Sequence, residues 1–159
     1  MLTYDKDTGI FRWKIKPARN IVIGSEAGSF NTAGYRRIRI DGEEILAHRI
    51  AWAMDKGAWP KEEIDHKNQE PSDNRIDNLQ EATRVQNACN RKAQRNNKSG
   101  FKGVRLACLK KDGTQSWDVS ITINGKLTQV YGFKSAEEAH EHYKILAVQF
   151  HDPAFVNFG

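Results

Sequence analysis

Residues 117–123 alternate apolar and polar side chains without a break, and this pattern limits the fold of the chain more than any other stretch. The apolar positions, which would share one face of a strand, are Trp117, Val119, Ile121 and Ile123. The polar positions on the opposite face are Asp118, Ser120 and Thr122. The pair Asn124-Gly125 is a strong hairpin signal and leads into a second strand over residues 126–133. The stretch therefore predicts an antiparallel hairpin with one buried face.

A helix is predicted directly after this hairpin. Residues 135–138 (Ser-Ala-Glu-Glu) form a capping box, and apolar residues then recur at helical spacing until Pro153. A further strand is expected over residues 101–106. Residues 100–159 therefore predict a three-stranded antiparallel sheet packed on one helix.

The part of the chain before residue 93 is predicted to begin with a region rich in short strands. Asp41-Gly42 is a second hairpin signal, with a strand candidate on each side. A helix should follow over about residues 48–55 and end near Gly57. His48, at the start of this helix, is expected only to pack beside the site described next.

A short strand, a polar loop over residues 67–75 and a helix over about residues 83–92 carry the candidate chemistry. A carboxylate and an amide oxygen can bind a hard divalent cation, and an imidazole can accept a proton from water. The candidate catalytic residues, which supply these groups, are Asp65, His66, Asn78 and Asn87.

Two details of this site stay open in the sequence. Adjacent residues of a regular strand point to opposite faces, so either the strand bends at Asp65 and His66 or one of the two has a supporting role. Asn90 lies one helical step beyond Asn87, on about the same face, and is a competing metal ligand.

These residues, together with the upstream run Ala47-His48-Arg49-Ile50-Ala51-Trp52, resemble the HNH endonucleases of the phage and homing type. The resemblance covers residues 1–93 and implies a ββα-metal nuclease core that acts on double-stranded DNA. It implies that Asp65 and Asn87 bind the metal, that His66 is the general base, and that Asn78 braces the loop by hydrogen bonding to its backbone. Oxygen ligands suit Mg²⁺ or Mn²⁺ better than zinc.

The charge distribution favours a nucleic-acid partner. The net charge is +5, and residues 84–111 contain nine lysines and arginines but neither Asp nor Glu. Solvated protein surfaces usually mix both signs, so a stretch this one-sided indicates phosphate neutralisation. The phosphate contacts predicted from this stretch are Arg91, Arg95, Lys98, Lys102 and Arg105. Residues 94–99 are expected to form a basic polar linker.

The C-terminal module resembles the Apetala-type (ethylene-response-factor) DNA-binding domain. The motifs that carry this resemblance are Gly103-Val104-Arg105, Trp117, Tyr131-Gly132-Phe133 and Ser135-Ala136-Glu137-Glu138-Ala139. The resemblance implies a sheet that lies in the major groove of DNA, which accepts a β-structure of this width. The positions that match contact residues of that family are Lys102, Arg105, Ser120, Thr122 and Gln129.

Composition excludes a membrane protein of the helical kind. The longest apolar runs fall far short of the ~20 residues that a membrane span needs. The two cysteines, Cys89 and Cys108, lack the CxxC spacing of a zinc or redox site. We expect a cytoplasmic protein (host cytoplasm for a phage product) without a small-molecule cofactor, and the sequence carries no signal for oligomeric state or target site.

The combined expectation is an α+β chain with a β-rich N-terminal region, a ββα-metal nuclease core and a sheet-on-helix module. Its predicted domains are residues 1–93 and 100–159. The predicted function is that of a metal-dependent DNA endonuclease, which nicks strands and is targeted by its C-terminal domain. The alternative is a non-catalytic, sequence-specific DNA-binding regulator that retains a nuclease fold.

Overall fold

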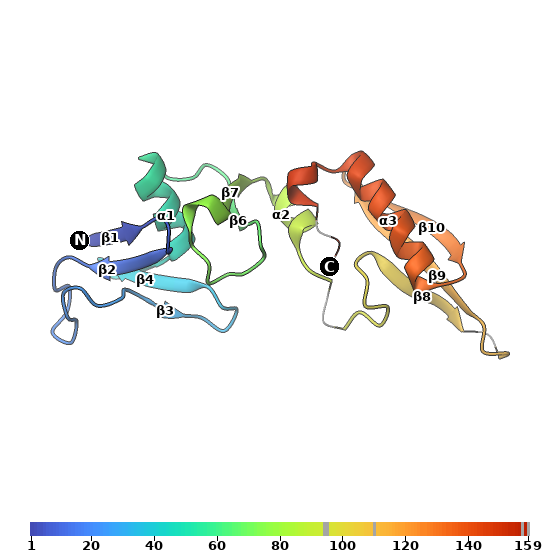
Figure 1. Cartoon of the computed structure of the whole chain (residues 1–159), viewed down its shortest axis with the longest axis horizontal. Helices are drawn as coiled ribbons and strands as arrows, with labels where there is room; N and C mark the ends of the chain where they lie inside the picture. Colours follow the sequence, from blue (N-terminus) through green and yellow to red (C-terminus); the bar gives the residue numbers. More distant parts are fainter. Residues whose placement is uncertain (94–95, 110, 157, 159) are drawn as a thin grey trace. The chain divides into compact units, whose positions relative to one another are not determined.

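A computed structural model describes residues 1–93, 96–109, 111–156 and 158 of the chain. The chain is a mixed α/β protein, in line with the coarse part of the α+β prediction, and it has two compact units that comprise residues 1–85 and 86–159 (Figure 1), while the ββα-metal core stays a prediction. Each unit is described by itself below. The predicted domain boundaries at residues 93 and 100 stay predictions, and part of the predicted linker lies outside the described residues.

Unit 1 contains three small antiparallel sheets and one α-helix. The strands are β1 (Leu2–Asp5), β2 (Ile10–Trp13), β3 (Ser29–Phe30), β4 (Arg36–Ile40), β5 (Glu43–Leu46), β6 (Glu63–His66) and β7 (Leu79–Ala82). The sheets have the strand orders β1-β2, β3-β4-β5 and β6-β7. The helices are α1 (Ala47–Lys56) and the 3-10 turn η1 (Ile76–Asn78).

Local sequence signals explain the hairpin and the helix at the centre of unit 1. Asp41 and Gly42 have φ values of 51° and 91°, the backbone conformation that a two-residue hairpin between β4 and β5 requires. Helix α1 ends at Gly57, whose φ of 72° is the left-handed conformation common at helix C-termini. The core of unit 1 joins residues of α1 to Ile64 of β6 and Leu79 of β7. Packing therefore holds the β6–β7 hairpin beside the start of α1.

Unit 2 contains a three-stranded antiparallel sheet of order β10-β9-β8. Its elements are β8 (Val104–Leu109), β9 (Gln115–Ile123), β10 (Lys126–Phe133), α3 (Ala136–Phe150) and the 3-10 turn η2 (Pro153–Phe155). Helix α2 (Arg84–Asn90) begins at the end of unit 1, and most of its residues belong to unit 2.

The core of unit 2 lies between one sheet face and α3. Val104, Val119 and Ile121 of the sheet share a buried cluster with Ala139 and Tyr143 of the helix. The helix begins with the predicted capping interaction, in which the Glu138 backbone N–H donates to Ser135 Oγ at 3.1 Å. The alternation over residues 117–123 thus places its apolar residues toward the helix and leaves the polar face of the sheet on the other side.

Within the described part of the chain, no helix combines the length and the apolar character needed to cross a membrane.

Candidate active site

Strand β6 carries the two central residues of the candidate site. It pairs with β7 in continuous antiparallel register, with Asp65 opposite Gln80 and His66 opposite Leu79. The Gln80 side-chain amide donates to Asp65 Oδ2 at 3.0 Å. Because successive residues of a regular strand face opposite sides, Asp65 and His66 point to different sides of β6. The ladder shows no break at Asp65 or His66, and the alternative of a supporting role for one of the two stays a prediction.

His66 lies in a cluster of three rings. Its ring centroid is 5.0 Å from that of His48, with the two rings perpendicular, and 5.9 Å from that of Tyr35. Tyr35 and His48 also contact each other edge to face, with centroids 5.5 Å apart. His48 comes from the first turn of α1 and is buried, as is His66. The expectation that His48 packs beside the site agrees with this arrangement, whereas Tyr35 was not predicted.

Burial keeps both histidines neutral over a wider pH range than usual. It lowers the pKa of His66, and this effect is opposed by the hydrogen bond from His66 Nε2 to Asn74 Oδ1 and by the charge of Asp65. Burial, with smaller contributions from His66 and Arg49, lowers the pKa of His48 to about 3. At neutral pH the ring cluster therefore contains uncharged imidazoles, the form that can accept a proton.

Asn74 is a site residue that the sequence analysis missed. Its side chain is almost fully buried, at 1% exposure, and its Oδ1 lies 3.5 Å from His66 Nε2. Its Nδ2 donates to the Ser72 carbonyl at 3.2 Å, and its own carbonyl accepts from the Tyr4 hydroxyl at 2.7 Å. Because an amide oxygen only accepts, this pairing favours the neutral tautomer with the proton on Nε2. The only sequence signal was its place in the same Asn-rich run as Asn78.

Glycine at position 9 allows the β1–β2 turn to approach the loop at Asn74. Gly9 has a φ of +73°, and a Cβ there would lie 2.7 Å from backbone atoms of Asn74 and Arg75. The Ile76 N–H also donates to the Lys6 carbonyl at 3.1 Å. The turn between β1 and β2 thus helps to fix the residue that contacts His66.

Asn78 bridges the polar loop through both polar groups of its side chain. Its Oδ1 accepts from the Asn68 N–H at 3.0 Å, and its Nδ2 donates to the Asp73 carbonyl at 2.8 Å. Hydrogen bonds from Arg75 lower the pKa of Asp73 to about 2, so this loop carboxylate stays charged. The predicted bracing contacts of Asn78 are therefore present, while its contribution to catalysis stays a prediction.

Asn87 belongs to a different part of the chain from the other candidates. It lies on α2, in residues 86–159, whereas Asp65, His66 and Asn78 lie in residues 1–85. Asn87 is half-buried, and its competitor Asn90 is buried. The structure therefore brings together three of the four predicted residues, and the place of Asn87 at a metal stays a prediction.

The donor chemistry fits a Mg²⁺ or Mn²⁺ ion held by few protein ligands. Among the described residues, no cluster of three or more His, Cys, Asp or Glu side chains could hold a metal. Mg²⁺ does not need such a cluster, since it commonly binds one or two carboxylates and fills its other positions with water and substrate phosphate. The Asp65 carboxylate with one amide oxygen is a donor set of this kind.

The predicted phosphate contacts have different surroundings. Arg91 and Lys98 are exposed, and Arg95 lies outside the described residues. Lys102 donates from Nζ to the Cys89 carbonyl, and burial lowers its pKa. Arg105 is exposed and forms an ion pair of 3.2 Å with the buried carboxylate of Asp118.

The predicted base-reading residues lie together on the polar face of the unit 2 sheet. Gln129 and Ser120 are directly opposite each other in the β9–β10 register, and Thr122 lies two residues along β9. The Tyr131 hydroxyl donates to Gln129 Oε1 at 2.8 Å. Asp118 is on the same face but is buried, since it pairs with Arg105 and accepts from the Gly132 N–H.

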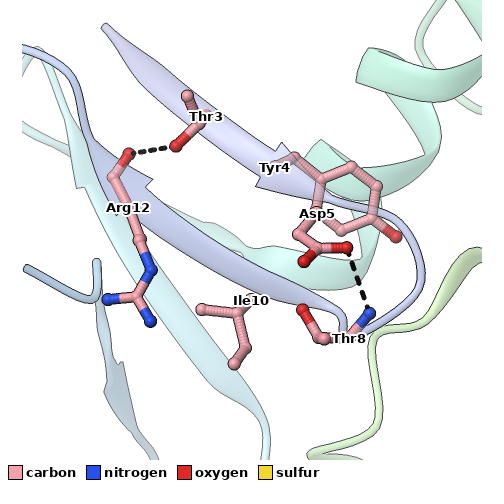
Figure 2. Close-up of a pocket in the computed structure, with 6 residues that line it drawn as sticks. All are labelled: Thr3, Tyr4, Asp5, Thr8, Ile10 and Arg12. Atoms are coloured by element: carbon pink, nitrogen blue, oxygen red, sulfur yellow. Dashed lines mark hydrogen bonds between the residues drawn. The ribbon is translucent and has the colours of Figure 1, made fainter. Parts of the chain in front are cut away.

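A shallow hollow on the β1–β2 hairpin is separate from these residues. Figure 2 shows its lining, in which Thr8 N–H donates to Asp5 Oδ1 and Thr3 Oγ1 donates to the Arg12 carbonyl. Backbone hydrogen bonding, first from Asp7, lowers the pKa of the Asp5 carboxyl. The hollow contains none of the predicted site residues and has no part in the proposals below.

A sequence model of the HNH endonuclease family matches residues 46–89. The match begins at the end of β5 and includes β6, β7 and nearly all of α2. It contains all four predicted catalytic residues, and His48 and Asn74 as well. A search of curated proteins and a search of solved structures give no match. The chain thus contains an HNH endonuclease domain at residues 46–89, and the Apetala-type resemblance has no support from these comparisons.

Proposed function

We propose that this protein is a metal-dependent DNA endonuclease that nicks double-stranded DNA. The observation that carries the proposal is the buried Asp65-His66 pair on β6, inside the range that matches the HNH endonuclease family. Burying a carboxylate and an imidazole costs free energy, and such groups concentrate at functional sites. Family membership supports a nuclease hydrolase, and the specific steps below are our proposal.

His66 is proposed as the general base. Its lowered pKa leaves the ring neutral at cellular pH, and Asn74 orients it through Nε2. In that tautomer, Nδ1 can take a proton from an attacking water molecule. The ring contacts with Tyr35 and His48 restrict the rotation of His66, so that the base is already oriented before DNA binds.

Asp65 and Asn87 are proposed to hold one divalent cation, Mg²⁺ or Mn²⁺. The cation would supply charge neutralisation at the scissile phosphate and stabilise the leaving 3′ oxygen. In-line attack places the entering and leaving oxygens on opposite sides of the phosphorus.

The polar sheet face of unit 2 is proposed as the DNA-targeting surface. Ser120, Thr122 and Gln129 present hydrogen-bonding groups there, and the exposed Arg105, which is paired with Asp118, lies on the same face. Phosphate contacts position a protein on DNA, whereas contacts to base edges give sequence preference. The exposed Arg91 and Lys98 would add phosphate contacts from the segment before β8.

The proposal is tested by incubating the purified protein with supercoiled plasmid in Mg²⁺, in Mn²⁺ and in EDTA. We expect open circles to accumulate before linear DNA in either metal, because one chain carries one proposed site, and no product in EDTA. DNA binding in gel-shift assays without metal-dependent nicking would instead identify a non-catalytic DNA-binding regulator.

A further inference from the structure

Helix α2 is the shortest of the three α-helices in the described part of the chain. It has only seven residues, from Arg84 to Asn90, and isolated helices shorter than about 12 residues are marginal in water. Its described last turn carries no basic side chain that could interact with the exposed carbonyl groups at the helix C-terminus. Contacts from elsewhere in the chain can therefore add to the stability of this end of the helix.

Lys102 supplies the missing charge at the C-terminus of α2. Its ammonium group donates to the carbonyl of Cys89. Lys102 is itself fixed, because the adjacent Gly103 packs closely against Tyr143 of α3 and Val104 lies in the core. A cation that donates to a last-turn carbonyl satisfies an unpaired acceptor and interacts favourably with the helix dipole. Burial lowers the pKa of Lys102, which agrees with its withdrawal from solvent.

The end of α3 contacts α2 independently. His151 Nδ1 lies 3.5 Å from Cys89 Sγ, and Gln86 Nε2 donates to Asp152 Oδ2 at 3.4 Å. Both partners have fixed positions, since His151 is the C-cap of α3 and Asp152 caps η2 by accepting from the Ala154 N–H at 3.0 Å. Two separate stretches of unit 2 thus converge on α2.

We propose that Lys102 is a positioning residue for α2, assisted by His151 and Asp152. The proposal rests on the function proposed above, because α2 carries Asn87. In this proposal Lys102 stabilises the C-terminal end of α2. The sequence had instead predicted that Lys102 contacts a DNA phosphate, because it lies in the basic stretch.

The test compares full-length Lys102→Met with the wild type, with the conservative Lys102→Arg, and with Lys98→Met as a matched control at an exposed lysine. Amide hydrogen exchange of residues 84–90 is measured first, without metal or DNA. We expect exchange in Lys102→Met to be about tenfold faster, the factor for losing a hydrogen bond to a charged group, and Lys102→Arg to restore much of the protection. Lys98→Met should leave this segment unchanged.

The second measurement separates positioning from DNA contact. Lys102→Met should raise the Mg²⁺ concentration for half-maximal nicking several-fold, while nicking at saturating Mg²⁺ recovers much of the wild-type rate. Its slope of log affinity against log salt should equal that of the wild type. Lys98→Met should show the converse result, a normal Mg²⁺ requirement and a slope reduced by about one unit.

Two results for Lys102→Met would together overturn the proposal: unchanged hydrogen exchange in residues 84–90, and a salt slope reduced as in Lys98→Met. They would make Lys102 a phosphate contact. Absence of nicking by the wild type would reject the proposed function, whereas the exchange experiment would still decide whether Lys102 holds α2. If Lys102→Met does not fold, His151→Phe removes the contact to Cys89 from the other side. That variant should also accelerate exchange in α2, and unchanged exchange there would count against the proposal.

Discussion

The two units differ in where they place polar side chains. Unit 1 buries five polar residues, namely His48, Asp65, His66, Asn74 and Asn78. Among its described residues, unit 2 buries two, Asn90 and Asp118, and keeps its proposed base-reading residues at least partly exposed. A buried polar group must be hydrogen-bonded or its burial destabilises the protein, so the cluster in unit 1 has a fixed geometry.

This difference matches two kinds of task. A general base must hold its position relative to the reacting atoms, and buried partners such as Asn74 restrict it. A surface that reads DNA must remain open to a large ligand and can tolerate mobile side chains. The comparison leads us to expect large, localised effects from changes in unit 1 and smaller, graded effects from changes on the sheet face of unit 2.

The largest effect is expected for His66→Ala. Loss of the general base should lower the nicking rate by roughly 10²- to 10⁴-fold. DNA affinity should stay within a few-fold of wild type, because the base acts in the reaction and not in ground-state binding. Rates on supercoiled plasmid and gel-shift affinities would be measured, with His142→Ala from unit 2 as the matched histidine control. Undiminished nicking by purified His66→Ala would remove His66 from this role.

The next effect is acid destabilisation of unit 1 through His48. Its pKa is about 3 in the folded protein, against about 6.5 in the unfolded chain, so between pH 6.5 and pH 3 the unfolded chain binds the proton more strongly than the folded protein does. The stability contribution of neutral His48 is fully present above pH 6.5 and is lost progressively as the pH falls toward 3. Between pH 6.5 and 5 the loss in unfolding free energy should reach roughly 2 kcal/mol.

Urea unfolding in EDTA at several pH values checks this prediction. His48→Phe should show a flatter dependence of unfolding free energy on pH than the wild type. The lowered pKa of His66 acts in the same direction, so some acid dependence should persist in the variant. Identical pH dependence in the two proteins would contradict the proposed burial of neutral His48.

A smaller effect is expected for Asn78→Ala. This change removes two hydrogen bonds that join Asn78 to the backbone of Asn68 and Asp73. Unfolding free energy should fall by about 1–3 kcal/mol, and nicking should slow because the loop that holds Asn74 loosens. Asn78→Asp keeps the acceptor oxygen and loses the donor, so it should lie between alanine and wild type. Wild-type stability and rate in Asn78→Ala would show that the loop does not need this brace.

The smallest effects are expected on the unit 2 sheet. Each single alanine substitution, at Ser120, Thr122 or Gln129, should change the preference among DNA sites by about 1–3 kcal/mol or less. The total affinity for DNA and its salt slope should stay nearly unchanged. Binding to a randomised DNA pool would measure this preference. A uniform loss of affinity for all sites would instead indicate phosphate contacts, and no change at all would remove the sheet face from DNA recognition.

Local sequence signals were enough to predict several elements. Asp41-Gly42 and Asn124-Gly125 lie in hairpin turns with positive φ, and Ser135 caps α3. These features depend on residues that are neighbours in the chain, so their physical causes can be identified from the sequence. The Asp65-His66 pair was predicted in the same way, as adjacent residues of a short strand.

The partners of these residues could not be predicted, because they come from distant parts of the chain. The rings of Tyr35 and His48 contact His66 because the unit 1 core packs α1 beside β6. Lys102 and Asp118 have sequence contexts typical of exposed polar residues, yet tertiary contacts withdraw Lys102 toward α2 and bury Asp118. The sequence by itself determined the turns, the helix start and the reactive residue types, since these follow from local backbone preferences and side-chain chemistry. Only the tertiary structure decided their protonation and orientation, since burial and long-range hydrogen bonds exist only after the chain has packed.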